Sequence, residues 1–480
     1  MKALRYWSVR HAGVLARLYR QVARVAPWLA PVARLVGPRR FAAGLEPVER
    51  AAKSLFFDCR MCGDCALSVT GMACPSHCGK QMRNGPCGGV RADGTCEVNP
   101  AQRCIWLEAN DGDARIQPGH TPSWTKRVPP LDQRLRGQST WIKVITTGPA
   151  GHAAPQPPVP APPRESTGPL EQACRDGRFI VTVEIAPPDS PDPAVLLQRA
   201  RRFAGLVDAI NITDGAGAHC HMSSVAAASV LAAAGYTPVC QVGCRDRNRI
   251  AVQGDVLGAA ALGVRNVLCL TGDDVSQGDH PEAKPVFDLD AVNLLHILRG
   301  MRDRGEYASG RKLEQSPKLF LGATANPFVA PHAGRVANLE RKIDAGAQFI
   351  QTQFCFDLPL LDEFMAAVRA RGLHKRAAII VGVGTLSSAK ALRWMAANVP
   401  GVHVPDSVIE RIAGAEDQKA EGRRVCVEMI DALRRIEGVA GVHLMGHRNE
   451  ETLAQIIVEA GLRPAVATTP FSLPILETTP

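Results

Sequence analysis

Eight short runs of apolar and β-branched residues, each followed by an alanine-rich stretch, recur along residues 170–463. Strands that alternate with helices favour a parallel sheet. Eight such units in about 290 residues match the count and length of a (β/α)₈ TIM barrel, with a doubly wound open sheet as the runner-up. The predicted strands are 180–185, 207–212, 238–242, 266–270, 318–322, 349–353, 378–383 and 441–445, and helices are expected between them, for example at 192–204, 222–234 and 338–345.

Polar side chains recur where these predicted strands end, which is where the chemistry of such barrels lies. They are Glu184, Thr213, Asp214, Gln241, Thr271, Asp273, Thr324, Asn326 and Gln353. Glu184 ends the apolar run Ile-Val-Thr-Val-Glu and precedes Ile-Ala-Pro-Pro. A carboxyl group in an apolar setting has a raised pKa and can deliver a proton near neutral pH. An ion-paired barrel residue is the structural alternative.

Two further strand ends suit a ligand. Asp273 follows Thr271-Gly272, and a glycine there lets the backbone come close to a bound molecule. The amide of Gln353 suits a ligand that has both donor and acceptor edges. The sequence has no G-x-x-x-x-G-K-[ST] phosphate loop, no full dinucleotide fingerprint and no His-Glu-x-x-His motif.

Eight of the fifteen cysteines lie within residues 59–104. A cytosolic redox enzyme is an unfavourable home for four disulfides, so the cluster favours metal. The Cys-x₂-Cys-x₂-Cys start is typical of a ferredoxin-type run, and zinc also accepts four-cysteine sets. The run Asn-Gly-Pro-Cys-Gly-Gly at 84–89 predicts turns that aim backbone amides at sulfur. The candidate ligands are Cys59, Cys62, Cys65, Cys74, Cys78, Cys87, Cys96 and Cys104.

The net charge of +10 belongs to one end of the chain. Residues 1–45 hold nine Lys or Arg and no acid, which leaves 47 basic and 46 acidic residues elsewhere. Their apolar residues recur at three- and four-residue spacing, so this basic amphipathic arm is a mitochondrial presequence, an interfacial membrane helix, or a helix docked on its own protein or a partner. A nearly neutral body with 5% aromatic residues argues against nucleic acid.

Composition divides the rest of the chain. Residues 149–169 contain eight prolines and predict a stiff linker. The expected order is the arm at 1–45, a cysteine-rich metal or Fe–S module at 46–148, this linker, the barrel at 170–463 and an unstructured tail at 464–480. We expect a cytoplasmic protein, since the seven cysteines of the barrel fit a reducing compartment.

Taken in order, five barrel segments resemble the methylenetetrahydrofolate reductase family of flavin-containing barrels. They are Val-Glu-Ile-Ala-Pro-Pro at 183–188, Ile-Thr-Asp-Gly-Ala at 212–216, Leu-Thr-Gly-Asp at 270–273, Asn-Leu-Glu-Arg-Lys-Ile-Asp-Ala-Gly-Ala at 338–347 and Thr-Gln-Phe-Cys-Phe-Asp at 352–357. The cysteine module resembles the one named after the C-terminal region of that reductase, and the small cysteine-rich partner subunit found with it in acetogenic bacteria.

The resemblance implies reduction of 5,10-methylenetetrahydrofolate to 5-methyltetrahydrofolate by a ping-pong mechanism that can also run backwards. Glu184 would be the general acid that helps open the five-membered ring of the folate, Asp273 would tune the flavin, and Gln353 would bind the pterin. FAD would lie against Thr213, Asp273, Asn326, Asn338, Arg341 and Lys342. The sequence differs from well-known bacterial members at Gln241, Gly243, Thr271 and Asn326, where His, Thr, Arg and Tyr are usual.

The electron donor would be NADH, NADPH or a redox protein partner. At least one [4Fe–4S] cluster is favoured in the module as an electron relay, with zinc as the alternative. We also expect a homo-oligomer, and contact of the arm with a subunit or a membrane surface. Two other functions compete: a folate-dependent methyltransferase, which would need a thiolate–zinc site that the barrel lacks, and a non-catalytic electron-transfer or scaffold protein, which would not need Glu184, Asp273 and Gln353.

Overall fold

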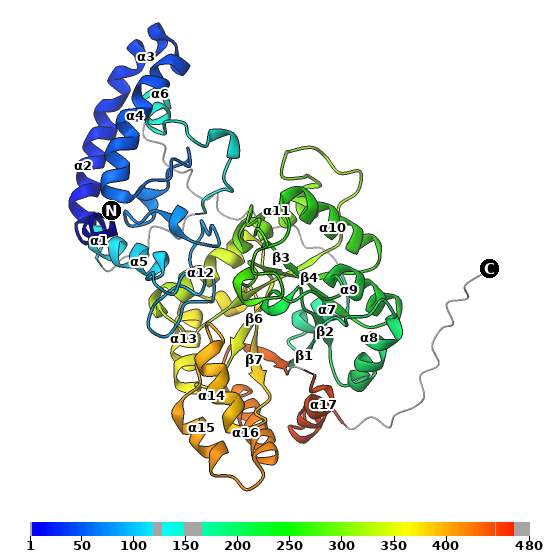
Figure 1. The fold of residues 1–480 in the computed structure, drawn as a ribbon. Coiled ribbons are helices and arrows are strands. Elements are labelled where there is room, and N and C mark those ends of the chain that lie inside the picture. Colours follow the sequence, from blue (N-terminus) through cyan, green and yellow to red (C-terminus); the bar gives the residue numbers. More distant parts are fainter. Residues whose placement is uncertain (1, 119–126, 148–165, 447, 465–480) are drawn as a thin grey trace. The chain divides into compact units, whose positions relative to one another are not determined.

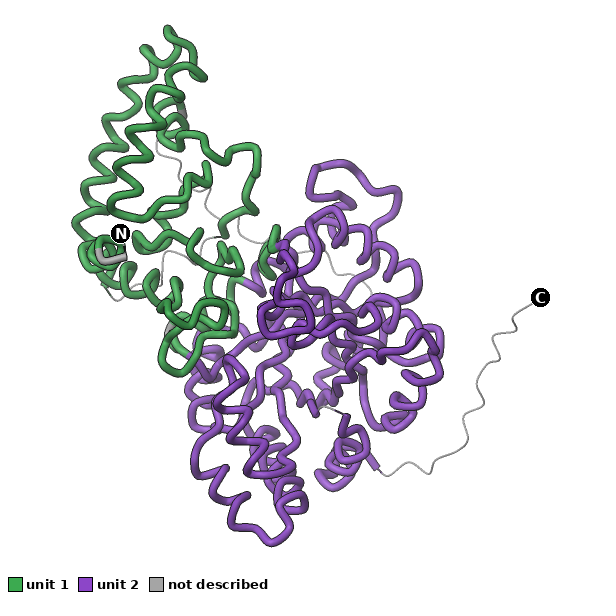
Figure 2. The backbone as a smooth tube through the Cα atoms, in the orientation of Figure 1, with its two compact units in different colours: residues 1–161, 287–293, 330–341 green, residues 162–286, 294–329, 342–480 purple. Residues whose placement is uncertain are grey.

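A computed structural model describes residues 2–118, 127–147, 166–446 and 448–464 of the chain (Figure 1). The chain divides into two compact units (Figure 2). Unit 1 comprises residues 1–161, 287–293 and 330–341, and unit 2 comprises residues 162–286, 294–329 and 342–480. Unit 1 therefore takes up two short segments from within the predicted barrel region. The predicted tail and most of the predicted linker lie outside the described residues.

Unit 2 contains a closed barrel of eight parallel strands in sequence order, which confirms the predicted fold class. The strands are β1 (Ile180–Ile185), β2 (Ala209–Ile212), β3 (Pro238–Gly243), β4 (Asn266–Leu270), β5 (Phe320–Ala325), β6 (Phe349–Phe354), β7 (Ala378–Gly384) and β8 (Val439–Met445). The register that closes the barrel pairs Ile180 with Gly441 and Val183 with Leu444. All strand carboxyl ends consequently point the same way and gather the loops that follow them at one end.

Helices follow the strands, as expected for this architecture. They are α8 (Pro193–Ala200), α9 (Ser224–Ala233), α10 (Arg249–Ala261), α11 (Ala291–Arg304), α12 (His332–Ala345), α13 (Leu358–Ala370), α14 (Ala389–Asn398), α15 (Asp406–Ala413), α16 (Gln418–Leu433) and α17 (Glu450–Glu459). Helix α12 begins at His332, six residues before its predicted start. Side-chain oxygens cap several of these helices; in α10, for example, Asn248 accepts from the backbone N–H groups of Ile250 and Ala251.

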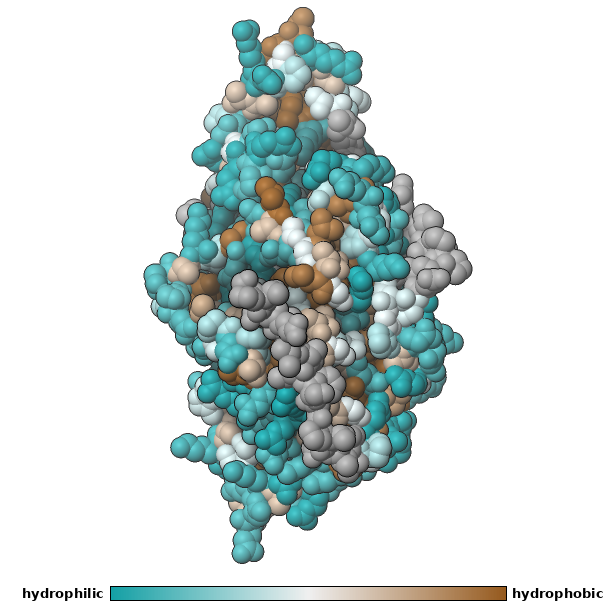
Figure 3. Space-filling view, turned by 90° about the vertical axis from the view of Figure 1, so that its right-hand side faces the viewer, coloured by the Kyte–Doolittle hydropathy of each residue, from teal (hydrophilic) through white to brown (hydrophobic). Residues whose placement is uncertain are grey.

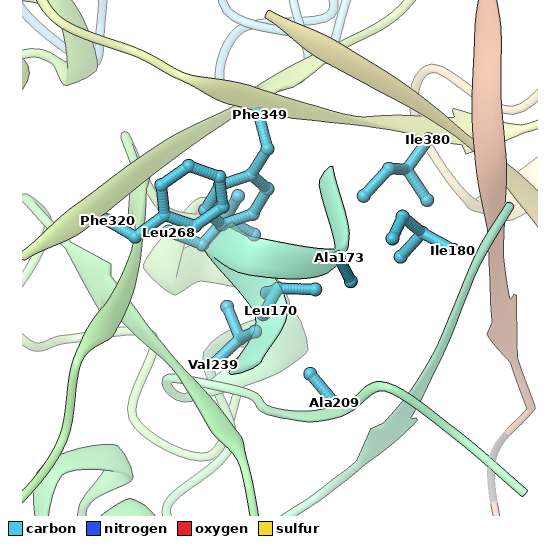
Figure 4. Packing of buried hydrophobic residues seen from close by; sticks show 9 residues of the cluster. All are labelled: Leu170, Ala173, Ile180, Ala209, Val239, Leu268, Phe320, Phe349 and Ile380. Carbon is cyan, nitrogen blue, oxygen red and sulfur yellow. The ribbon is translucent and has the colours of Figure 1, made fainter. Parts of the chain in front are cut away.

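An additional helix, α7 (Pro169–Arg175), packs among the amino-terminal ends of the strands. Its Leu170 and Ala173 join one apolar layer with a residue from each of seven strands, β1 to β7 (Figure 4). The rings of Phe320 and Phe349 stack in this layer with centroids 5.0 Å apart. Gly322 lies under the Phe349 ring, and a Cβ there would come within 2.2 Å of it. The amino end of the barrel is therefore filled by apolar packing.

Unit 1 begins with helices that surround an irregular cysteine-rich segment. They are α1 (Lys2–Arg10), α2 (Ala12–Val25), α3 (Ala30–Val36), α4 (Pro38–Phe57), α5 (Ile105–Ile116) and α6 (Trp141–Thr147), with a 3₁₀ turn, η1 (Ala26–Leu29), between α2 and α3. The side chains of Ala12 and Ala16 pack against Leu67, Met72 and Cys74. Between α4 and α5 the backbone is held by short 3₁₀ turns and isolated β-bridges.

Within the described residues, no helix is long and apolar enough to cross a membrane.

Candidate functional site

Glu184 lies at the carboxyl end of β1, inside the ring of strands. The side-chain amide of Gln241, on β3, donates to its Oε2 at 2.9 Å, and Nε2 of His443, on β8, lies 3.7 Å from the same oxygen. The side chain of Glu184 is 27% exposed. Its surroundings are therefore polar and partly open, and not the apolar setting that the sequence suggested.

A buried polar layer supports Glu184 from below. Gln351 on β6 donates to the side chains of Thr182 and Asn211, each at 3.1 Å, and Asn211 donates back at 2.6 Å. Thr182 also bonds Nδ1 of His443 at 2.9 Å, which turns the other ring nitrogen towards Glu184. All four side chains of the layer are nearly inaccessible to solvent. This network fixes the orientation of the imidazole below the carboxyl group.

Asp273 stands three residues beyond the end of β4 and is exposed. Its Oδ2 accepts from the backbone N–H of Gly217 at 2.7 Å, which ties the loop after β4 to the loop after β2. Gly272 has φ +98°, and a Cβ there would come within 2.9 Å of the Cβ of Arg245. The position therefore requires glycine for its backbone conformation and for the close approach of its neighbour.

Arg245, which the sequence analysis did not single out, is a buried cation beside Asp273. It donates to the carbonyl of Gly215 at 3.1 Å and forms a two-pronged pair with Asp246. Burial lowers the pKa of Arg245, but the charges of Asp246 and Asp273 outweigh that effect and raise it. A permanent positive charge therefore stands at this end of the barrel.

The adjacent pair Thr213-Asp214 has two different environments. Both carboxylate oxygens of Asp214 are engaged by Arg247, at 2.6 and 2.8 Å, and by the N–H of Gly243. The Oγ1 of Thr213, in contrast, is buried and has no hydrogen-bond partner among the described residues. Asp214 thus holds the loops together, whereas Thr213 offers an unused polar atom.

The predicted ligand helix α12 is divided between the units. Asn338 and Arg341 belong to unit 1, where they donate to the backbone carbonyls of Pro86, at 3.3 Å, and Asn84. The Oδ1 of Asn338 is buried and lacks a hydrogen-bond partner within the described part of the chain. Lys342 belongs to unit 2 and donates to the carbonyl of Thr324 at 2.6 Å.

Asn326 and Gln353, two further predicted residues of the barrel, use their side chains to hydrogen-bond backbone groups. Asn326 donates to the carbonyl of Gly401 at 2.8 Å and accepts from the N–H of Phe328. The Oε1 of Gln353, at the end of β6, accepts from the N–H of Phe354 at 3.0 Å. In unit 2 the closed barrel brings Glu184, Thr213, Asp273, Asn326, Gln353 and Lys342 to the carboxyl-terminal end of the strands.

In unit 1 the first four cysteines of the module line a small cavity of about 20 Å³. They are Cys59, Cys62, Cys65 and Cys74. Burial, together with the nearby charges of the other three thiols, raises the pKa of Cys74 to about 12. The N–H of Met61 points at the sulfur of Cys59, at 3.4 Å.

A buried ion pair borders this cavity. Lys53 on α4 donates to Glu49 at 2.5 Å, and Glu49 also accepts from the side chain of Ser139 and from the backbone N–H of Trp141. Although burial favours the neutral amine, the charges of Cys65 and Glu49 raise the pKa of Lys53. The lysine therefore supplies a lasting positive charge beside the first set of thiols. Charged residues on a helix usually face solvent, so the sequence did not mark this pair.

The other four cysteines form a second set whose thiols influence one another. They are Cys78, Cys87, Cys96 and Cys104. The N–H of Gly89 donates to the sulfur of Cys87 at 3.4 Å, which confirms the predicted turn that aims an amide at sulfur. A buried ion pair again lies alongside, since Lys80 contacts Glu97 at 2.5 Å and Glu97 lies 3.3 Å from the sulfur of Cys87.

Arg335, on the part of α12 that belongs to unit 1, is a third buried cation near this second set. Burial lowers its pKa to about 10, while the charges of Cys87 and Cys104 oppose that shift. All fifteen cysteines lie among the described residues, and none of them forms a disulfide there. Within the described residues, no three Cys, His, Asp or Glu side chains converge closely enough to hold a metal ion.

Comparison with known sequences identifies the family to which the barrel belongs. Residues 169–461 match the family model described as methylenetetrahydrofolate reductase, which is more than half of the chain. The chain belongs to the methylenetetrahydrofolate reductase family. A second model, described as methylene-tetrahydrofolate reductase C terminal, matches residues 43–133. Both parts of the predicted resemblance are thereby confirmed, and the chain is an enzyme of an oxidoreductase family.

Named relatives agree with this assignment. The 5,10-methylenetetrahydrofolate reductase of Pectobacterium carotovorum is 26% identical over 307 residues, which cover 61% of this chain and 93% of the relative. The enzyme of the same name from Escherichia coli is 26% identical over 212 residues, 42% of this chain and 63% of the relative. A probable NADPH-dependent methylenetetrahydrofolate reductase of Caenorhabditis elegans is 24% identical, over 50% of this chain and 34% of the relative.

Two solved structures show weak similarity to this chain. A Clostridium thermocellum protein described as binding two copies of 5-methyl-5,6,7,8-tetrahydrofolic acid has a TM-score of 0.44 and 15% identity, covering 61% of this chain and 98% of that chain. DmoA from Hyphomicrobium sulfonivorans has a TM-score of 0.37 and 10% identity, covering 61% of this chain and 90% of that chain.

Proposed function

We propose that this chain reduces 5,10-methylenetetrahydrofolate to 5-methyltetrahydrofolate, or catalyses the reverse oxidation, and that Glu184 is its general acid. The observation that carries the proposal is the placement of Glu184 at the carboxyl end of β1. The Gln241 amide and the His443 imidazole hold this carboxyl group in position, with part of it open to solvent. A proton delivered from Glu184 to the folate would help to open its five-membered ring to an iminium ion.

Three other groups of this chain assist that step. Asp273 supplies a negative charge near the developing cation, and its bond from Gly217 fixes its position. Gln353 offers an amide that can face the pterin. The buried polar layer around Gln351 keeps the His443 ring from rotating, so that Glu184 keeps the same neighbour throughout the reaction.

The flavin belongs to the proposal as well. Its fit rests on Thr213 Oγ1, a buried polar atom of the barrel that has no hydrogen-bond partner in the described residues, since such an atom usually acquires one from a ligand. The residues of unit 2 that would hold FAD are Thr213, Asp273, Asn326 and Lys342. When bound, the flavin carries the hydride equivalent between an NAD(P)H or protein donor and the folate.

The test of the acid is Glu184→Gln, with Glu282→Gln, an exposed glutamate of the same unit, as the control. We expect the Glu184 variant to reduce its flavin normally with the donor and to lose roughly 10²–10⁴-fold in folate reduction. Stopped-flow absorbance separates the two half-reactions. A variant that reduces folate at the wild-type rate would show that Glu184 is not the acid.

The module completes the proposal as a metal-bearing electron relay. The four thiols of the first set line one cavity, and iron–sulfur clusters and zinc both take four-cysteine sets. A cluster can pass electrons to a flavin, whereas zinc has no redox chemistry, so a [4Fe–4S] cluster is the group proposed here, with zinc as the alternative. Iron with acid-labile sulfide in the purified protein is the expected result, and zinc alone would leave the module a structural role.

A further inference from the structure

An apolar stripe runs along the outer side of α2, η1 and α3. Its side chains follow each other at spacings of three or four residues, which places them on one side of the helical segment. Each is between 46% and 59% exposed. The members of this apolar stripe are Val14, Leu18, Val22, Val25, Leu29, Val32 and Val36.

The opposite side of the same helices is already used. Ala12 and Ala16 pack against the cysteine segment, and Ala30 and Ala33 pack with Ile145 of α6. Helix α1 is anchored by a buried ion pair from Arg5 to Glu108 and by the hydroxyl of Ser8 on the carbonyl of Phe56. The arm is thus an integral part of unit 1, and its apolar stripe is the side that unit 1 leaves uncovered.

The positive charge of the residues around the apolar stripe indicates which kind of partner the stripe binds. Exposed arginines accompany it, and residues 1–45 contain no acidic residue to neutralise them. Arg17 and Arg20 donate only to carbonyls of their own helix, those of Gly13 and Ala16, in the described structure. A second copy of the chain would bring like charges together, whereas an anionic surface would attract them. The arginines concerned are Arg10, Arg17, Arg20, Arg24, Arg34, Arg39 and Arg40.

The η1 and α3 parts of the segment each add one large side chain that is exposed to solvent. Trp28 is 80% exposed and Leu35 is 89% exposed. Figure 3 shows brown surface at the upper end of the molecule, where Figure 1 labels α3. Tryptophan prefers the boundary between a bilayer and water, and amphipathic helices that combine such residues with arginine lie in that boundary.

We propose that the α2–η1–α3 segment docks this protein on a lipid bilayer that carries anionic headgroups. The apolar stripe, Trp28 and Leu35 enter the headgroup region, while the arginines beside them contact lipid phosphates and carboxylates. The segment lies on the bilayer and does not cross it, in keeping with the absence of a spanning helix among the described residues.

The test is co-sedimentation of the full-length protein with vesicles of phosphatidylcholine alone or with about a third phosphatidylglycerol. We expect binding to the anionic vesicles, little binding to the neutral ones, and a loss of about tenfold or more in Trp28→Ser/Leu35→Ser and in Arg17→Glu/Arg24→Glu. Ile250→Ser is the matched control, because Ile250 is 78% exposed on α10 of unit 2, and it should bind as wild type.

Three results would overturn the proposal. One is the absence of vesicle binding by the wild-type protein. Another is equal loss in Ile250→Ser, which would mean non-specific adhesion. The third is a concentration-dependent dimer, seen by light scattering, that Trp28→Ser/Leu35→Ser abolishes, because a second copy would then be the occupant. Circular dichroism and the melting temperature of each variant confirm that it is folded, and Arg17→Lys/Arg24→Lys should restore binding.

Discussion

The barrel of unit 2 and the cysteine-rich segment of unit 1 hold their functional side chains by different means. In the barrel, strand register places Glu184, Gln353 lies where the register between β6 and β7 shifts, and backbone hydrogen bonds between strands supply the scaffold. In residues 58–104 the backbone repeatedly turns through left-handed conformations at non-glycine residues, which are Asp58, Met61, Met72 and Gln81. Buried Lys–Glu pairs beside the thiols replace the sheet as the cross-link. The barrel is thus closed by its own strands, whereas side-chain pairs beside the thiols cross-link the module.

Removal of metal from the cysteine-rich module is expected to produce the largest difference in stability between the module and the barrel. Metal binding to thiolates contributes on the order of 10–16 kcal/mol to folding in small metal domains. A chelator under reducing conditions should therefore open residues 58–104 to proteolysis while the barrel keeps its circular dichroism. If the two units melt together, or if neither responds, the barrel and the module do not differ in the way described.

Glu49→Gln should cause the second-largest loss of stability. It removes the negative partner of Lys53 and weakens the acceptor of Ser139 and Trp141, in a group that is 1% exposed. Breaking a buried ion pair costs about 3–5 kcal/mol. Urea unfolding of unit 1 measures the loss, and Glu46→Gln, on the same helix but paired at the surface with Arg50, should change stability by less than about 1 kcal/mol.

The stability that Glu49 contributes is expected to depend on pH. Burial raises the pKa of Glu49, but the Lys53 charge and the hydrogen bonds to Glu49 outweigh it, and the pKa is lowered overall. A carboxyl group whose pKa is lower in the folded state stabilises above its unfolded pKa, and this contribution is lost as the pH falls through the folded value. The difference in stability between wild type and Glu49→Gln should shrink on acidification, and a constant difference would contradict the pairing.

Gly272→Ala should lower stability the least of these variants, and the loss should be confined to the barrel of unit 2. The alanine would sit at φ +98° with its Cβ 2.9 Å from that of Arg245, which costs about 1–3 kcal/mol and displaces Asp273. Gly254→Ala, inside α10 with open space around it, is the control and should gain about 0.5–1 kcal/mol. Thermal melts compare the two. A loss of metal from the module in Gly272→Ala would mean that the units are coupled.

The sequence predicted the barrel closely because strand periodicity and helix length are local properties. β1 and β4 have the predicted bounds, and β5 starts only two residues after its predicted start. The position of Glu184 was predictable for the same reason. Its polar setting was not, because Gln241 and His443 come from strands that only closure of the barrel brings near.

Two other features escaped prediction for physical reasons. The Thr182, Gln351 and His443 layer sits at inward positions, where a sequence pattern cannot distinguish a buried polar group from a solvated one. Arg335 is a buried helical residue, and the thiols that act on its pKa, those of Cys87 and Cys104, lie more than 200 positions earlier in the chain. Only the tertiary structure brings such distant groups together.

The apolar layer at the amino end of the barrel can be completed only after β7 has been synthesised. Leu170 of α7 is made before β1, yet its packing partners extend to Ile380 on β7. At about 5–20 residues per second, the ribosome needs on the order of 10–40 s to deliver that last strand. Until then the layer around α7 lacks its last member, so part of its apolar surface stays exposed on the nascent chain, where chaperones can bind it. The helix that completes the barrel is thus one of the first elements of unit 2 to be made and one of the last to reach its final packing.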